Sequence, residues 1–108
     1  MKGRNLIMKK IIDGKLYNTE TAKVIADYWN GYPGGDFNVI NETLYQKKTG
    51  EYFLFGKGGS LTHYAEQVWG GMAYGEEIIP YTEKQAKEWA VKHLTADKYL
   101  ELFGEVEE

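Results

Sequence analysis

The chain has 108 residues, of which 43% are hydrophobic and 27% charged, with a formal net charge of −3 at pH 7. This length and balance predict one compact domain spanning 1–108 with a single hydrophobic core. The absence of cysteine excludes a disulfide framework and thiolate-bound metal sites, and it favours a cytoplasmic protein. No apolar run approaches the roughly 18 residues that a membrane-spanning helix needs, so we expect no membrane partner.

The opening residues MKGRNLIMKK contain a second methionine, Met8. A native start at Met8 would make residues 1–7 an optional N-terminal extension and would remove Lys2 and Arg4. Arginine is the usual reader of guanine edges and of phosphate, and Arg4 is the one arginine in the sequence. The composition therefore disfavours direct binding of nucleic acid.

Turn signals divide the first half of the chain into short strands. Asp13-Gly14 lies between two apolar-rich stretches and predicts a two-residue hairpin turn of type I′. The segment 21–32 shows both helical and alternating spacing of apolar residues, and we favour a strand. Three glycines and a proline predict a loop at 30–36, and Thr49-Gly50 predicts a turn between strands near 40–48 and 51–56.

The segment 51–56 carries apolar side chains on both faces. Because side chains alternate along a strand, Tyr52 and Leu54 are expected on one face, and Phe53 and Phe55 on the other. This pattern predicts a central strand that is covered on both sides.

The glycine-rich run at 56–59 resembles a phosphate-binding loop in composition, but its spacing differs. Its lysine lies between the glycines, so the run matches neither GxxxxGK[ST] nor GxGxxG. We expect a strand end and a tight turn into a short helix capped by Ser60 or Thr62. A further strand is expected at 77–79, ended by Pro80, which has no N–H for a sheet ladder.

Two helices are predicted at the C-terminal end. Thr82 and Gln85 form a capping box before the first helix, and the second runs from a Thr95 cap to Gly104. The side chains expected to face inward are Ala86, Trp89, Ala90 and His93 in the first helix, and Tyr99, Leu100 and Phe103 in the second. Residues 105–108 form an acidic tail. The class is therefore α+β: an antiparallel β-meander of about four to five strands packed with two C-terminal helices.

Candidate catalytic and metal-binding residues are few. His63 and Glu66 could present an i,i+3 pair, but a zinc site needs three or four ligands. Ser60 and His63 could form the nucleophile and base of a small hydrolase, although no acid partner or nucleophile elbow accompanies them. His93 is expected to be a hydrogen-bonded packing residue. We therefore expect no enzymatic activity, no catalytic residues, no cofactor and no metal.

Aromatic residues give the strongest functional signal, with nine tyrosines, three tryptophans and four phenylalanines. A core of this size cannot bury all of them. Trp29 and Tyr32 lie around one glycine-rich loop, and Trp69 and Tyr74 lie around another. Aromatic side chains in such loops are typical of protein–protein contacts. The alternative is that these rings fold back over the sheet.

Three runs of sequence, MKKIIDGKLYNTETA, NETLYQKKTGEYFLFGKGGSLTHYAE and IIPYTEKQAKEWA, resemble a family of small, mostly uncharacterised proteins of bacterial phages and other mobile elements. The resemblance spans most of residues 8–104 and brings no catalytic motif. Small acidic phage-borne proteins without enzymatic signatures include many anti-CRISPR proteins, which bind a Cas effector and block DNA recognition or cleavage. The resemblance thus implies a non-catalytic inhibitor of a bacterial defence system, acting in the host cytoplasm on a Cas effector, with Cas9-type favoured.

A Cas effector presents basic channels for its guide and target nucleic acids. An acidic, aromatic-rich domain could occupy such a channel with carboxylates in place of phosphates. The partner-binding residues expected on this basis are Asp36, Glu42, Glu76 and Glu77, together with Trp29, Tyr32, Trp69 and Tyr74. The alternative is a nucleic-acid-binding regulator of a phage or mobile element, which would gather Lys9, Lys10, Lys15, Lys47, Lys48 and Lys57 on one face.

Overall fold

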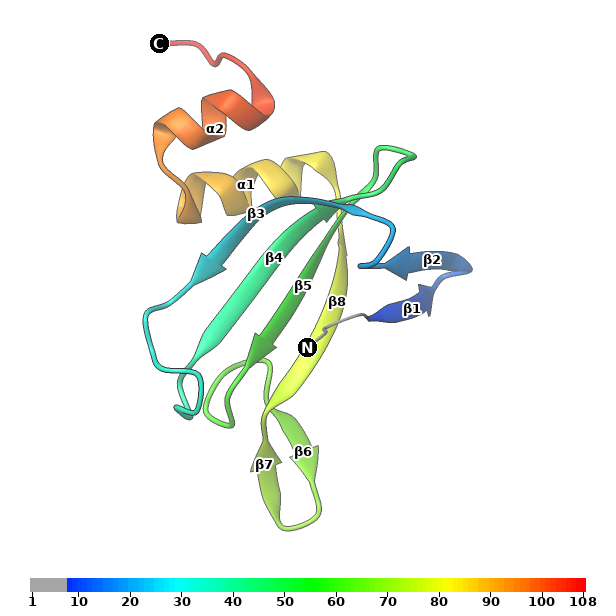
Figure 1. Ribbon diagram of the computed structural model, residues 1–108, viewed down its shortest axis with the longest axis vertical. Helices are drawn as coiled ribbons and strands as arrows, with labels where there is room; N and C mark the ends of the chain where they lie inside the picture. The colour runs from blue at the N-terminus through cyan, green and yellow to red at the C-terminus, as the bar shows by residue number, and fades with distance from the viewer. Residues whose placement is uncertain (1–7) are drawn as a thin grey trace.

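The computed structural model describes residues 8–108, so the optional extension expected at 1–7 lies outside the described residues. In this part of the chain, eight strands precede two helices (Figure 1). The strands are β1 (Lys9–Ile12), β2 (Lys15–Asn18), β3 (Lys23–Trp29), β4 (Ile40–Gln46), β5 (Tyr52–Gly58), β6 (Glu66–Val68), β7 (Gly71–Ala73) and β8 (Gly75–Tyr81), and the helices are α1 (Glu83–His93) and α2 (Ala96–Phe103). The expected α+β class is confirmed.

The centre of the fold is a four-stranded antiparallel sheet with the order β3-β4-β5-β8, while β1–β2 and β6–β7 pair as separate hairpins. β5 is an inner strand, and its Phe53 and Leu54 are 0% and 1% exposed on opposite faces. Leu54 joins Leu44 and Ala90 in a core under α1, whereas Phe53 belongs to a second core on the other face. The prediction of a central strand covered on both sides is therefore confirmed.

The β1–β2 hairpin covers the face of the sheet opposite α1. Its turn residues Asp13 and Gly14 have φ angles of 52° and 79°, which the predicted type I′ turn requires. Tyr17 in β2 packs edge to face against Phe53 with ring centroids 5.5 Å apart, and Phe53 stacks on Tyr45 at 5.0 Å. The hairpin thus closes the second core with aromatic side chains.

Helix α1 begins at the predicted capping box. Thr82 Oγ1 accepts a hydrogen bond from Gln85 N at 3.1 Å, and Gln85 Oε1 accepts one from Thr82 N at 2.8 Å. The predicted inward residues Ala86, Trp89 and Ala90 are all buried against the sheet. The helix therefore presents Trp89 to the inner face, where it meets the residues of the candidate site.

Helix α2 caps the same core more loosely. It runs from the predicted Thr95 cap to Gly104, and its inner side carries Tyr99 and Phe103. The prediction that Leu100 faces inward is wrong, because Leu100 is 40% exposed and Leu102 packs against the core instead. Residues 99, 102 and 103 form an i, i+3, i+4 stripe, which leaves position 100 outside the buried face.

The segment between β5 and β8 differs most from the sequence-based expectation. The short helix expected after Ser60 or Thr62 is wrong, because residues 59–65 form successive turns. The Thr62 hydroxyl donates to Gly59 O at 2.8 Å and accepts from Tyr64 N at 3.2 Å, and these side-chain hydrogen bonds support the backbone bonds of the turns, from Thr62 N to Gly59 O and from Ala65 N to Thr62 O. The β6–β7 hairpin that follows has no counterpart among the expected elements.

Strand β8 is longer than expected and includes Pro80, which lies opposite Phe53. Proline is tolerated there because β8 is an edge strand of the sheet. The other edge strand, β3, has a shift of register between Val24 and Ala26.

Figure 1 shows α1 and α2 at one end of the molecule, and the loop 30–39, the segment 59–65 and the β6–β7 hairpin at the other. In the described part of the chain, neither helix is long and apolar enough to cross a membrane.

Candidate functional site

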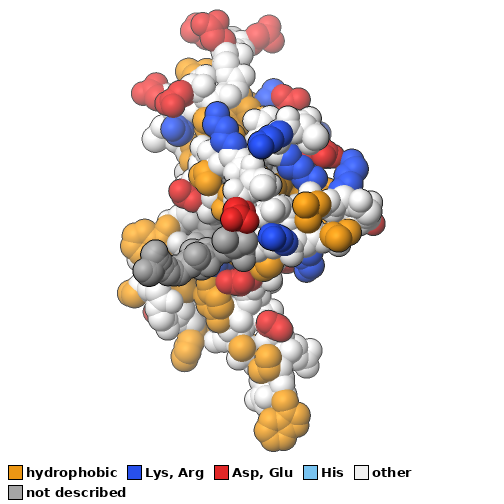
Figure 2. Space-filling model, turned by 45° about the vertical axis from the view of Figure 1, so that its right-hand side comes forward, with side chains coloured by type: hydrophobic (Ala, Val, Ile, Leu, Met, Phe, Trp, Pro, Cys, Tyr) orange, Lys and Arg blue, Asp and Glu red, His pale blue; other side chains and the backbone are white. Residues whose placement is uncertain are grey.

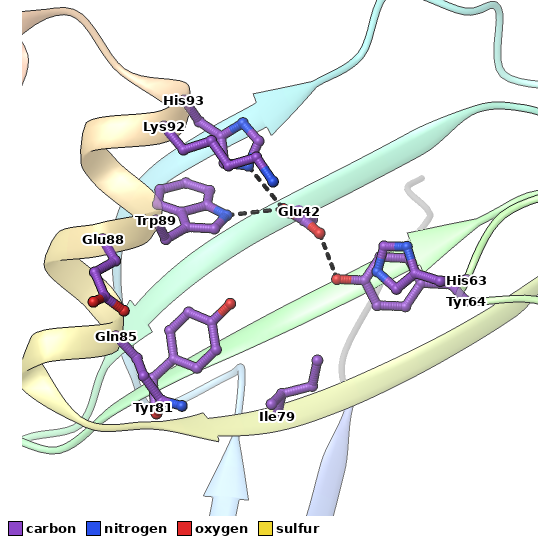
Figure 3. Close-up of a pocket in the computed structure, with 10 residues that line it drawn as sticks. All are labelled: Glu42, His63, Tyr64, Ile79, Tyr81, Gln85, Glu88, Trp89, Lys92 and His93. Carbon is purple, nitrogen blue, oxygen red and sulfur yellow. Dashed lines mark hydrogen bonds and ion pairs between the residues drawn. The ribbon is translucent and has the colours of Figure 1, made fainter.

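A buried carboxylate lies at the centre of the helix-covered face. Glu42 in β4 is 7% exposed, because it shares the inner face of the strand with Leu44, two residues further on. Its Oε2 accepts a hydrogen bond from the Tyr64 hydroxyl at 2.6 Å, and its Oε1 accepts one from Trp89 Nε1 at 2.8 Å (Figure 3). The sequence analysis placed Glu42 among exposed partner-binding carboxylates, and its burial corrects that placement.

The glycine run at 56–59 provides the surface on which Tyr64 lies. An added Cβ at Gly56 would overlap the phenol ring of Tyr64, and one at Gly58 would overlap the Thr62 hydroxyl. A Cβ at Gly75, which pairs with Gly58 across the strands, would overlap the Tyr64 carbonyl oxygen. The glycines therefore allow close approach of the segment 59–65 to the sheet, and this packing role explains them without a phosphate.

His93 closes the cluster from the end of α1. Its Nε2 lies 3.7 Å from Glu42 Oε1, and its ring packs on Tyr28 with centroids 3.8 Å apart. Burial lowers the pKa of His93 from its usual value; the carboxylate of Glu42 partly opposes this shift, while Lys92 adds to it. Burial, followed by the hydrogen bond to Glu42, raises the pKa of the Tyr64 hydroxyl well above its usual range. At neutral pH, the two hydrogen-bond donors to the carboxylate and the neighbouring His93 are therefore uncharged.

An open cleft of about 390 Å³ lies over this cluster, between α1 and the segment 59–65. Figure 3 shows the Tyr81 hydroxyl directed towards Glu42, with the indole of Trp89 on the α1 side. Glu88 and Lys92 also line the cleft, and both are exposed. Residue spacing in the sequence does not reveal this site, because the hydrogen bonds that build it join residues 22 and 47 positions apart.

The expected partner-binding aromatics lie at the end of the sheet away from the helices. Trp69 is 100% exposed in the turn between β6 and β7, and Tyr74, before β8, is 46% exposed. Trp29 and Tyr32 are 56% and 45% exposed, and Trp29 Nε1 donates to Tyr32 O at 2.6 Å. Figure 2 shows hydrophobic side chains on the projecting hairpin. These four rings therefore do not fold back over the sheet.

The expected carboxylates other than Glu42 lie at the same end. Asp36 is half-buried and accepts a hydrogen bond from Asn38 N at 2.7 Å, which orders the loop. Glu76 and Glu77 are exposed and adjacent in β8, so they project from opposite faces. Seven of the eight expected partner-binding residues thus share one end of the molecule, to which Phe37, Leu61 and Met72 add exposed apolar side chains that the sequence analysis passed over. Their signal was the same: apolar residues in or next to glycine-rich loops.

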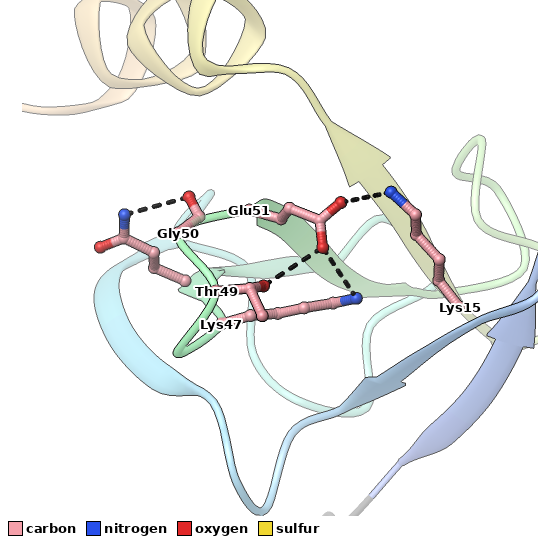
Figure 4. Close-up of polar contacts among 6 residues, drawn as sticks. Lys15, Lys47, Thr49, Gly50 and Glu51 are labelled. Carbon is pink, nitrogen blue, oxygen red and sulfur yellow. Dashed lines mark hydrogen bonds and ion pairs between the residues drawn. The ribbon is translucent and has the colours of Figure 1, made fainter.

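The six lysines of the nucleic-acid alternative do not all present a free positive charge. Lys15 Nζ lies 2.7 Å from one carboxylate oxygen of Glu51, and Lys47 Nζ lies 3.4 Å from the other (Figure 4). The hydrogen bond from Lys15 lowers the pKa of Glu51 and raises that of Lys15. Lys57 pairs across the strands with Glu76. Three of the six lysines therefore have a carboxylate beside them.

Of the two residues of the hydrolase alternative, His63 is among those that line the cleft and Ser60 is not. Ser60 is half-buried, whereas His63 is exposed and packs its ring against Tyr64 with centroids 4.1 Å apart. Among residues 8–108, no group of three or more His, Cys, Asp or Glu side chains could hold a metal ion.

No family model matches the chain, and neither a curated protein nor a solved structure is significantly similar to it.

Proposed function

We propose that this protein binds another protein through the end of the sheet formed by the loop 30–39 and the β6–β7 hairpin, and acts as a non-catalytic inhibitor of a bacterial defence system. In its specific form it is an anti-CRISPR protein that occupies a basic nucleic-acid channel of a Cas effector, most simply one of the Cas9 type. Its place of action is then the cytoplasm of the host cell.

One observation carries the proposal: exposed aromatic side chains from separate segments share one end of the molecule, with Trp69 fully exposed at the tip of a hairpin. Apolar side chains gathered in this way mark interaction sites rather than ordinary surface. Tryptophan and tyrosine dominate binding energy when a partner buries them. The projecting shape of the hairpin suits insertion into a groove.

The charge of the same end supports a basic partner. Asp36, Glu76 and Glu77 accompany the aromatic residues, and the chain as a whole has a net charge of −3. A Cas9-type effector holds its guide–target heteroduplex in a positively charged channel. Complementary charge would speed association and fix the orientation of the hairpin in such a channel.

The test is inhibition of DNA cleavage by a purified Cas9-type effector loaded with guide RNA. Trp69→Ala should weaken inhibition by about 30-fold or more, as expected for a buried anchor. Because Trp69 is fully exposed, the same change should alter stability by less than about 0.5 kcal/mol. The matched control is Val91→Ala, which removes an exposed apolar side chain from α1 and should leave inhibition unchanged.

Glu77→Lys provides an independent arm, because it should weaken binding most at low salt, where unscreened charges act over longer distances. Inhibition that is unchanged in both Trp69→Ala and Glu77→Lys would exclude this end of the molecule. Absence of binding to any Cas effector would overturn the specific form of the proposal. Salt-dependent binding to duplex DNA that is lost in Lys48→Glu would instead support the nucleic-acid-binding regulator.

A further inference from the structure

We propose that the cleft above Glu42 binds a cationic group, an alkylammonium or alkylguanidinium, with its charged head at the Glu42 carboxylate and its alkyl stem against the rings of Trp89 and Tyr81. This site is separate from the aromatic end of the molecule, and the proposal does not depend on the proposed function.

The first step is the charge of Glu42. The residue is 7% exposed, and its hydrogen-bond donors, the Tyr64 hydroxyl and the Trp89 indole, carry no charge. His93 Nε2 lies 3.7 Å away, beyond hydrogen-bond distance, and its burial favours the neutral imidazole. A carboxylate removed from water is costly unless a cation accompanies it, so the site favours a ligand that supplies one.

The second step is the capacity of the carboxylate to bind more donors. An ionised carboxylate offers about four lone-pair sites on its two oxygens. Tyr64 occupies one site on Oε2, and Trp89 occupies one on Oε1. Each oxygen can therefore accept a further hydrogen bond, and an ammonium or guanidinium head can supply it from the cleft.

The third step is the shape and lining of the cleft. Its volume of about 390 Å³ lies within the range of small-molecule pockets, about 300–1,000 Å³. Trp89 and Tyr81 line it with aromatic rings, and Figure 3 shows the Tyr81 hydroxyl directed towards Glu42. Aromatic faces next to a carboxylate attract cations, since the ring quadrupole adds to the charge of the acid. Lys92, which also lines the cleft, repels an entering cation. Removing its charge should therefore strengthen cation binding, whereas removing the charge of Glu42 should weaken it.

The experiment is a titration of the full chain with n-butylammonium and n-butylguanidinium, read from the indole Nε1–H signal of Trp89 in ¹⁵N–¹H NMR spectra. 1-Butanol serves as the neutral ligand of similar shape. Glu42→Gln removes the charge and can keep the fold, because its carbonyl can accept from Trp89 while its amide donates to the Tyr64 oxygen. Glu76→Gln, exposed in β8, is the matched control.

We expect both cations to shift the Trp89 signal saturably, whereas 1-butanol does not. Glu42→Gln should weaken binding by about tenfold or more, as the loss of a charge-assisted hydrogen bond implies. Lys92→Met should strengthen binding by about two- to fivefold at low salt, because it removes a nearby repulsion. Glu76→Gln should leave affinity within about twofold of the unmodified chain.

A second pair of ligands identifies the source of the cation. A capped tripeptide with a central lysine should bind more tightly than n-butylammonium if the cleft receives a side chain of a protein partner, and equal affinity indicates a free amine. The same peptide with acetyl-lysine should not bind. The proposal is overturned if neither cation shifts the Trp89 signal saturably, or if Glu42→Gln and Lys92→Met both bind the cations as the unmodified chain does.

Discussion

Replacing Gly56 with alanine is expected to destabilise the protein by about 2–4 kcal/mol, although alanine in a strand normally stabilises by about 0.5–1 kcal/mol relative to glycine. The reason is steric, because the new Cβ would overlap the phenol ring of Tyr64, which is 5% exposed and hydrogen-bonded to Glu42. The ring must shift or leave the sheet.

The loss of stability in Gly56→Ala depends on whether the Tyr64 ring leaves the sheet or shifts in place, and these two responses give its upper and lower limits. If Tyr64 leaves, the protein loses a buried aromatic side chain, about 1.5–3 kcal/mol, and a hydrogen bond to a charged group, about 1.5–3 kcal/mol. If the sheet and the ring adjust instead, overpacking costs about 1–3 kcal/mol. The expected value lies between these limits after the intrinsic gain of alanine is subtracted.

The assay is urea unfolding followed by circular dichroism, with Gly34→Ala as the control, because no atom lies within 4 Å of a Cβ added at Gly34. Gly56→Ala should also be tested in a Tyr64→Ala background, where the loss should disappear because the clashing ring is gone. A Gly56→Ala variant as stable as the unmodified chain, or an equal loss in both backgrounds, would refute the steric argument.

Three further changes test the same region. Glu42→Leu leaves the buried donors of Tyr64 and Trp89 without an acceptor and should destabilise the protein by about 2–5 kcal/mol in urea melts, well beyond the effect of Glu42→Gln. Because burial lowers the pKa of His93 in the folded protein, the unfolded chain takes up the proton first; stability should fall as the pH drops below about 6.5, and His93→Gln should reduce this fall. Thr82→Ala removes the capping box of α1 and should lower the free energy of unfolding by about 1 kcal/mol.

Each change has a matched control. Glu76→Leu alters an exposed carboxylate and should have little effect on stability, so an equal loss in Glu76→Leu and Glu42→Leu would contradict the burial argument. His63→Gln changes the other histidine, which is exposed, and a pH response that is identical in both histidine variants would remove His93 from the explanation. Thr82→Ser keeps the capping hydroxyl and should remain close to the unmodified stability.

Local signals predicted the elements that local chemistry determines. Asp13-Gly14 specifies its turn through positive φ, and Thr82 with Gln85 specifies the start of α1 through hydrogen bonds three residues apart. The β6–β7 hairpin was not predicted, because its strands have three residues each, too few to show the alternation of apolar and polar side chains. Its signal was the Trp69-Gly70 turn, where Gly70 has a φ of 93°.

The candidate site could not be predicted from spacing. The exposure of the aromatic residues at the end of the sheet could be predicted, because Trp69 and Tyr74 lie in glycine-rich sequence that offers them few side chains to pack against. Glu42 has the appearance of an ordinary strand carboxylate, and only the folded sheet brings it to Tyr64 and Trp89. The role of Gly56 likewise depends on where the segment 59–65 returns to the sheet, which no local pattern encodes.

The two edges of the sheet bear on whether copies of this protein can join strand to strand. An open, regular edge strand is a template on which further copies can add strands and grow into fibres. Here the edge strand β8 contains Pro80, which has no N–H to offer, and the edge strand β3 is interrupted between Val24 and Ala26. Both breaks disfavour endless growth along the sheet. We therefore expect contact with another molecule to involve exposed side chains, such as Trp69, more readily than the addition of strands.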